Sequence, residues 1–194
     1  MKVKTLFLIC FLSITCLLNA ADKPVIQIHT DNSSLIFRIA DNGRLYQSYL
    51  GKKLSHETDI SHLPHGTEAY ITHGMEDYFE PAIHILHNDG NPSLLLKYVS
   101  HETKAVSQGV NETIITLGDD KYPVTVKLHY VTYPAEDIIK TYTEISHKEK
   151  KPVVLHQYAS SMLHLNRAKY YLTEFAGDWA HEANVTEREL AFGK

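Results

Sequence analysis

A chain of 194 residues is long enough for one good-sized domain, or for one domain with a targeting segment, and too short for two ordinary domains with linkers. Hydrophobic residues make up 43% and charged residues 22%, with 9 Gly and 7 Pro, which is typical of a folded domain and excludes a collagen-like or low-complexity chain. The net charge of −4 and the lack of a basic patch argue against nucleic acid as a partner, because few cations are available to replace the counterions of a phosphate backbone.

The first predicted element is a secretory signal peptide over residues 1–21. Two lysines precede an apolar run from Leu6 to Leu18, and this run of about 13 residues is too short for a hydrocarbon core that needs about 20. We therefore expect cleavage after Ala20 or Ala21, export to the periplasm or the extracellular space, and no membrane anchor.

Both cysteines of the chain, Cys10 and Cys16, lie inside this segment. A lipoprotein acylated at Cys16 is the alternative, but Ser13-Ile14-Thr15 lacks the Leu and the small residue that usually precede such a cysteine. The mature chain has no thiol, so its stability is expected to come from burial of an apolar core rather than from disulfides.

From Pro24 onward, apolar residues recur with a period of two, which predicts short strands. The later predicted strands are rich in β-branched and aromatic residues and cover 82–86, 94–100, 112–117, 124–132, 138–145, 153–165 and 170–175. No stretch sustains a helical stripe, and parallel strands would need crossover helices. The pattern therefore predicts an all-β fold, a large antiparallel β-sandwich.

Four segments with typical turn chemistry separate these strands, and a hairpin is predicted at each: 41–43, 88–92, 118–120 and 147–152. The least regular stretch is 56–80, which is polar, rich in histidine and contains Gly66 and Gly74. A long loop that keeps its place in a compact sandwich is often functional.

The residue types that usually support catalysis or metal binding do not form recognisable motifs. None of the 13 His belongs to a His-x-His or His-Glu-x-x-His motif, so no metal and no cofactor is predicted. There is no Gly-x-Ser-x-Gly motif, and neighbouring acids such as Glu76 and Asp77 rarely hold the facing geometry that glycosidic cleavage needs. No residue is therefore predicted to be catalytic.

Trp179, the only tryptophan, lies in the segment 177–182 beside two acids and a histidine. Its indole ring suits a stacking platform for the apolar face of a sugar, which makes Trp179 a candidate substrate-binding residue. The alternative is an anchor in the core or in an interface between domains.

Four segments of the chain resemble, in the same order, the N-terminal domain of glycoside hydrolase family 36 α-galactosidases. GDWAHE at 177–182 is similar to the family's Gly-x-Trp-x-x-Glu, and HGMEDYFEPA at 73–82 is similar to its Gly-x-x-Asp-Tyr/Phe-Arg-x-Pro-Ala. LKYVSH at 96–101 resembles the family's Leu-Arg-Tyr-x-Ser-His, and LYQSYLGKKL at 45–54 resembles its early strand and Gly-Lys-x-Leu turn. Together these segments span nearly the whole mature chain.

The resemblance implies a β-supersandwich that precedes a (β/α)8 barrel. In this family the nucleophile and the acid/base of a retaining mechanism are aspartates of the barrel, which needs about 250 residues. We therefore expect residues 22–194 to be the non-catalytic N-terminal domain of a secreted α-galactosidase that acts on terminal α-galactosides, truncated before the barrel. Whether this chain by itself is an enzyme stays open.

The resemblance also implies a site residue. In the family, an aspartate or an aromatic residue from the sandwich can reach the galactose pocket, sometimes in a neighbouring subunit of a homo-oligomer. The matching position is Asp77, whose carboxylate would accept hydrogen bonds from sugar hydroxyls. The alternative role for Asp77 is to cap its own loop.

Two other functions are carried as alternatives. The first is a free-standing carbohydrate-binding sandwich without catalysis, which would use Trp179. The second is a purely structural sandwich that docks the barrel, which would carry an exposed apolar patch around Trp179 and the strand at Tyr170 and Tyr171.

Overall fold

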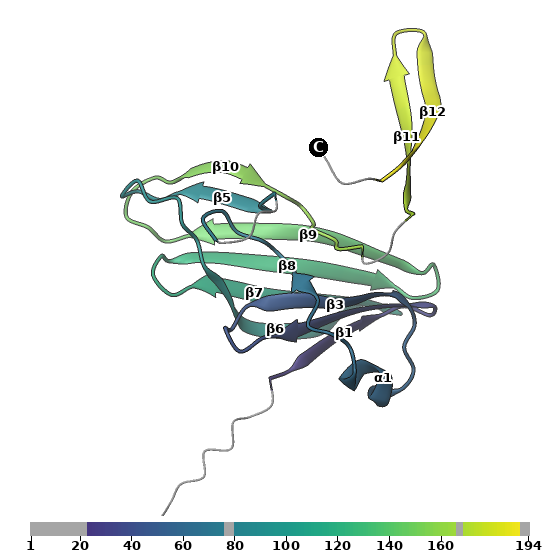
Figure 1. Ribbon diagram of the computed structural model, residues 1–194, viewed down its shortest axis with the longest axis horizontal. Coiled ribbons are helices and arrows are strands. Elements are labelled where there is room, and N and C mark those ends of the chain that lie inside the picture. Colours follow the sequence, from purple (N-terminus) through teal and green to yellow (C-terminus); the bar gives the residue numbers. More distant parts are fainter. Residues whose placement is uncertain (1–22, 76–79, 166–168, 191–194) are drawn as a thin grey trace, which may run out of the picture.

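Alternation of apolar and polar residues produces a fold of strands, seen in a computed structural model (Figure 1). The structure describes residues 23–75, 80–165 and 169–190, so the predicted signal peptide lies outside the described residues. The described elements are β1 (Val25–His29), β2 (Ser33–Ile39), β3 (Leu45–Lys52), α1 (Glu57–Ser61), β4 (Thr67–Glu68), β5 (Ile83–Leu86), β6 (Leu96–Ser107), β7 (Val110–Asp119), β8 (Val124–Tyr133), β9 (Ile138–His147), β10 (Val154–Tyr158), β11 (Tyr171–Asp178) and β12 (His181–Glu189).

Two four-stranded antiparallel sheets form the body of the molecule. One has the strand order β1-β2-β3-β4 and the other the order β6-β7-β8-β9. Side chains from both sheets meet in one core, where the rings of Phe37 and Tyr130 lie 5.2 Å apart. Every second residue of β8 from Val124 to Tyr130 is buried in this core, as period-two alternation requires. The prediction of an all-β antiparallel sandwich is confirmed.

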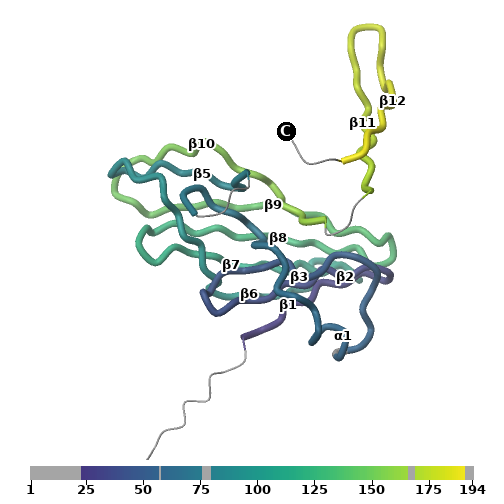
Figure 2. Tube along the Cα trace, viewed as in Figure 1, coloured from purple at the N-terminus to yellow at the C-terminus, as the bar shows by residue number. Residues whose placement is uncertain are grey.

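Two smaller strand pairs complete the described fold. The strands β5 and β10 pair with each other, and a hydrogen bond from Tyr70 Oη to the carbonyl of Ala159 (2.8 Å) joins the end of β10 to the core. The strands β11 and β12 form a hairpin that stands clear of the sandwich in Figures 1 and 2. All side chains of β12 are exposed, so this hairpin packs on no other described element along that strand.

Two of the four predicted hairpins are present. The turn at 41–43 joins the paired strands β2 and β3, and the turn at 118–120 joins β7 and β8. The hairpins predicted at 88–92 and 147–152 are wrong, because β5 pairs with β10 rather than with either chain neighbour. Turn chemistry specifies a local reversal of the chain, whereas the pairing partner depends on the burial of the whole strand.

The strand predicted at 153–165 is shorter than expected, since β10 ends at Tyr158. The chain then crosses between the sheets, where side chains rather than a strand ladder bind its backbone. Thr143 Oγ1 donates to the carbonyl of Ser160 (3.0 Å), and Gln47 Nε2 donates to the carbonyl of His164 (2.8 Å). Ala159 and Met162 of this segment pack against the core without belonging to a strand, whereas Leu163 and Leu165 are exposed.

Candidate functional site

The predicted site residue Asp77 lies outside the described residues, but both flanks of its loop are described. Thr72 and Ile83 form a β-bridge, and the amide of His73 donates to the carbonyl of Ile83 (3.0 Å). The amide of Ala82 donates to the carbonyl of Ile71 (2.7 Å). The two flanks therefore run side by side and hold the ends of the predicted loop together.

Gly74, at the start of the loop, rests on a second segment. Its φ of +86° lies in the left-handed region, and a Cβ at this position would be 2.9 Å from Ser93 Cα. Next to it, Thr72 Oγ1 donates to the carbonyl of Leu94 (2.5 Å). Residues 91–95, called the floor below, therefore pack against the base of the loop. Only glycine fits the contact with Ser93 without a shift of the neighbouring backbone.

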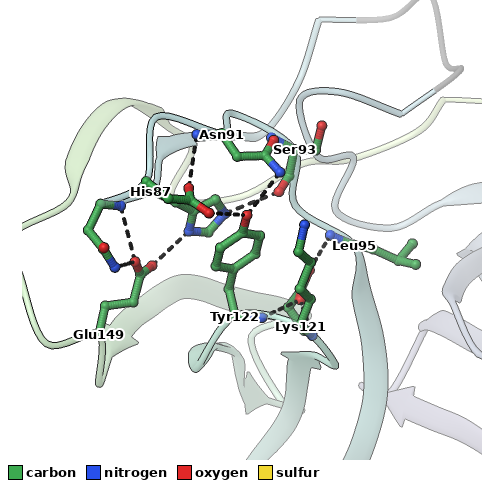
Figure 3. Close-up of polar contacts among 10 residues, drawn as sticks. His87, Asn91, Ser93, Leu95, Lys121, Tyr122 and Glu149 are labelled. Atoms are coloured by element: carbon green, nitrogen blue, oxygen red, sulfur yellow. Dashed lines mark hydrogen bonds and ion pairs between the residues drawn. The ribbon is translucent and has the colours of Figure 1, made fainter.

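His87 anchors that floor (Figure 3). Its side chain is fully buried, its Nδ1 lies 2.7 Å from Glu149 Oε1, and its Nε2 lies 3.1 Å from the carbonyl oxygen of Ser93. The ring thus connects Glu149, which follows β9, with the floor segment at Ser93. Burial would raise the pKa of Glu149, but hydrogen bonds from His87 and Asn88 outweigh this effect and hold the pKa below its ordinary value.

Tyr122 closes the same cluster from the loop between β7 and β8. Its hydroxyl donates to Asp89 Oδ2 (2.9 Å) and accepts a hydrogen bond from Asn91 Nδ2 (2.9 Å). The carboxylate of Asp119 accepts from three backbone amides, those of Leu95, Lys121 and Tyr122, at 2.5 to 2.8 Å. These polar groups satisfy one another, so the cluster holds the floor in position.

Sequence reasoning missed this cluster. Glu149 and His87 are 62 residues apart, and Tyr122 comes from a third connection. The available signal was the concentration of turn-forming polar residues at 88–92, 118–120 and 147–152, all of which meet at this end of the sandwich.

Three histidine rings lie in contact beside the loop base, with His73 stacked on His84 and His156 tilted against it. The rings of His73 and His84 lie 3.7 Å apart, and those of His84 and His156 lie 4.8 Å apart. Burial, followed by the neighbouring His73 and His156, lowers the pKa of His84. Within residues 23–75, 80–165 and 169–190, no group of three or more His, Cys, Asp or Glu side chains could hold a metal ion.

Trp179, the second predicted site residue, lies at the tip of the β11–β12 hairpin and is 91% exposed. Asp178 and His181 pair across the turn, Asp178 Oδ1 accepts from the amide of Trp179 (2.7 Å), and Ala180 adopts a φ of +62°. The interpretation of Trp179 as an anchor in the core of this domain is therefore wrong. A sugar platform and an interface anchor both remain compatible with its position.

Exposed apolar side chains concentrate in the same part of the chain. Among the described residues between 154 and 190, ten large hydrophobic side chains are exposed: Val154, Leu155, Tyr158, Leu163, Leu165, Tyr171, Phe175, Trp179, Val185 and Leu190. Tyr171 and Trp179, around which a docking surface was expected to carry an apolar patch, are both exposed. No helix in the described part of the chain is long and apolar enough to span a membrane.

The sequence of this chain was compared with models of known protein families. The sequence model of the glycosyl hydrolase family 36 N-terminal domain matches residues 42–194, which is most of the chain. The chain belongs to this family of N-terminal domains. The matched region includes the loop base, the His87 cluster and the whole hairpin of this family 36 domain.

Curated relatives of the family 36 domain are α-galactosidases. Alpha-galactosidase 2 of Hypocrea jecorina is 28% identical over 133 residues, and alpha-galactosidase C of Emericella nidulans is 25% identical over 133 residues. Each alignment covers 62% of this chain and 18% of the relative. The chain therefore spans a small part of the length of the curated relatives that it matches.

Solved structures share the fold of the family 36 domain. The α-galactosidase from Lactobacillus brevis has a TM-score of 0.74 at 20% identity, and the galactosidase domain of the α-galactosidase-sucrose kinase AgaSK has a TM-score of 0.78 at 20% identity. Both alignments cover 87% of this chain and 28% of the solved chain. A variant of the α-galactosidase AgaA from Geobacillus stearothermophilus, solved in complex with raffinose, has a TM-score of 0.77 at 18% identity.

Proposed function

We propose that this chain is the non-catalytic N-terminal domain of an exported α-galactosidase, and that it docks a catalytic barrel and shapes one wall of the sugar pocket. The observation that carries the proposal is the family match over residues 42–194. The barrel would supply both carboxylates of a retaining mechanism for terminal α-galactosides. Residues 1–21 would direct export to the periplasm or the extracellular space.

Docking is supported by the exposed apolar side chains between 154 and 190. Soluble domains rarely leave such side chains together in water, and large exposed patches are typical of interaction surfaces. The core of the sandwich lies between β1–β4 and β6–β9, so this surface is not needed for the core itself. A barrel covering it would gain hydrophobic contact without changing the sandwich.

Within the proposed enzyme, Asp77 would bind galactose hydroxyls as an acceptor and would take no covalent part. This role of Asp77 is supported by the structure at the base of the loop that carries it. The β-bridge between Thr72 and Ile83 and the contact of Gly74 with Ser93 fix that base. A rigid base reduces the entropy lost when a sugar is oriented. We propose the exposed ring of Trp179 as the second contact, either with sugar or with the barrel.

A chimera tests the proposal. The segment of Geobacillus AgaA that matches this chain is replaced by residues 23–194, and hydrolysis of raffinose is measured. The controls are AgaA with the segment deleted and the present chain alone. We expect hydrolysis by the chimera only. Turnover of an aryl α-galactoside by the chain alone, or full activity of the deleted AgaA, would contradict the proposed division of roles.

The exposure of Trp179 favours a second candidate function, binding of galactosides by the domain on its own. An indole that is 91% exposed at a hairpin tip presents a whole face to a ligand. Calorimetric titration of the chain with raffinose would then give saturable binding that Trp179→Ala removes. A flat titration at high sugar concentration argues against this function and leaves the docking role.

A further inference from the structure

Three segments that are far apart in the chain contribute one ring each to the histidine cluster, defined by His73, His84 and His156. His73 precedes Gly74 at the loop base, His84 lies in β5 and His156 lies in β10, and the two strands run side by side (Figure 1). The ring of His84 contacts both of the others, with centroid distances of 3.7 Å to His73 and 4.8 Å to His156. At such distances, a charge on one ring acts on the next.

The backbone segments that carry these rings are hydrogen-bonded to one another. The amide of His73 donates to the carbonyl of Ile83 (3.0 Å), and Ile83 is the first residue of β5. The strand β5 pairs in turn with β10. Repulsion between the rings would therefore act across the hydrogen bonds that hold the three segments together.

The pairing of β5 with β10 is short and interrupted. It consists of four residue pairs, and its register shifts between Leu155 and Gln157, so His156 is the extra residue of a β-bulge. The strand β10 is also poorly covered, since Val154 and Tyr158 are 50% and 62% exposed. Segments with few buried contacts open at a lower free energy than core strands.

The surroundings of His84 disfavour its protonation in the folded chain. Burial is the largest cause that lowers its pKa, and the neighbouring His73 and His156 lower it further. The folded chain therefore binds a proton at His84 less readily than the unfolded chain does. The neutral ring stabilises the fold above the ordinary pKa of 6.5, and this contribution is lost as the pH falls below 6.5 toward the lowered value.

Glu80 brings a carboxylate to β10 from the segment before β5. Gln157 Nε2 donates to Glu80 Oε1 (3.3 Å) and to the carbonyl of Pro81 (2.8 Å). A negative charge beside the cluster would favour protonated rings and oppose their mutual repulsion. The contribution of Glu80 must therefore be measured separately from that of the histidines.

We infer that the histidine cluster is an acid-sensitive contact that holds β10 on β5. With neutral rings, the contacts of His84 with His73 and His156 keep the three segments side by side. Below about pH 6, protonation of more than one ring places like charges next to one another, and β10 separates from β5 while the two main sheets stay folded. This inference goes beyond the proposed function and does not depend on it.

Hydrogen exchange followed by mass spectrometry tests the inference in the intact chain. Protection factors, which correct for the pH dependence of intrinsic exchange, are measured at pH 7 and pH 5 for β5, for β10 and for the core strand β8. We expect the protection of β5 and β10 to fall about tenfold on acidification and that of β8 to change less than about twofold. Unchanged protection of β5 and β10, or an equal loss in β8, would overturn the inference.

Substitutions identify the groups that respond. His84→Gln removes the ring that contacts both of the others, and should reduce the loss of protection in β10 to less than about twofold. His147→Gln, at an exposed position at the end of β9, is the matched control and should keep the full loss. Glu80→Gln should keep or enlarge the loss. A response that persists in His84→Gln, or that disappears in Glu80→Gln, would assign the acid sensitivity to another group and overturn the inference.

His156→Gln gives a second test in case His84→Gln disturbs β5 itself. His156 is exposed, so its replacement leaves the buried side of β10 unchanged, and the loss of protection on acidification should be smaller than in the wild type. NMR titration of the His84 ring is the independent readout. Its pKa should rise toward 6.5 in His156→Gln, because one neighbouring positive charge is removed. An unchanged pKa together with an unchanged loss of protection would overturn the inference.

Discussion

The ring of His87 lies parallel to the ring of Tyr122, with 3.5 Å between their centroids and 8° between their planes. One ring nitrogen of this imidazole lies 2.7 Å from a buried carboxylate oxygen, and the other lies 3.1 Å from a backbone carbonyl oxygen. Together with the contact of His87 with Glu149, this stacking joins three separate connections of the sandwich.

Glu149→Gln tests the strength of that junction. The amide keeps the shape of the side chain but removes the charge that His87 and the amide of Asn88 contact. We expect a loss of about 2 kcal/mol in the free energy of unfolding at pH 7, measured by urea denaturation. Glu136→Gln, in the exposed turn between β8 and β9, is the control and should change stability little.

The pH dependence of the same variant follows from the lowered pKa of Glu149. The folded pKa lies below the unfolded value, so ionised Glu149 stabilises the fold above its unfolded pKa, and this contribution is lost as the pH falls. The difference in stability between the wild type and Glu149→Gln should therefore shrink as the pH is lowered from 7 to 3. A difference that grows on acidification would contradict the assigned contact.

Glu112 on the outer face of the sheet β6-β7-β8-β9 gives a second acid-sensitive contact. Hydrogen bonds from Tyr142, His129 and Lys104 lower its pKa to about 2. Glu112 therefore stabilises the folded state above its ordinary pKa of 4.5, and this contribution disappears as the pH falls toward about 2.

Tyr142→Phe should raise the pKa of Glu112, because Tyr142 Oη donates to Glu112 Oε1 at 2.6 Å. We expect a loss of about 1–2 kcal/mol at pH 7 and a higher midpoint of acid unfolding, followed by circular dichroism. Tyr158→Phe, at an exposed position of β10, is the matched control. Identical acid midpoints for the two variants would show that the Tyr142 contact does not support Glu112.

Gly66→Ala tests how tightly the segment after α1 packs on β3. Gly66 has a φ of +80°, and a Cβ there would lie 1.9 Å from the carbonyl oxygen of Gln47. Gly109 has a similar φ of +72° but open space around it. Thermal unfolding should therefore show a loss of about 1 kcal/mol for Gly109→Ala and more than about 3 kcal/mol for Gly66→Ala. Equal losses would mean that backbone conformation alone limits both positions.

Trp179→Ala should leave the stability of the isolated chain within about 0.5 kcal/mol of the wild type, because the indole is 91% exposed. Phe37→Ala, which removes a buried core ring, should by contrast lose about 3–5 kcal/mol. The single tryptophan also makes fluorescence a direct test, since its emission should be that of an indole in water. Blue-shifted emission from the isolated chain would contradict the exposed position.

The sequence predicted several segments of the candidate site, but it did not predict how these segments contact one another. The loop at 56–80 was singled out by composition, and the family resemblance pointed to Asp77 within it. The sequence did not reveal that Gly74 rests on Ser93, or that His87 holds this floor through Glu149, because both contacts join residues far apart in the chain. Likewise, composition marked Trp179 as unusual without distinguishing a buried ring from an exposed one.

By itself, the sequence determined that the chain forms strands and turns, because period-two alternation and turn-forming residues act on neighbouring residues. It also carried the family, through motifs whose order is preserved along the chain. Only the tertiary structure decided that β5 pairs with β10, that the turns at 88–92 and 147–152 meet at one end, and that Trp179 lies at the tip of a hairpin. Such choices depend on which surfaces become buried together, a property of the whole chain rather than of any segment.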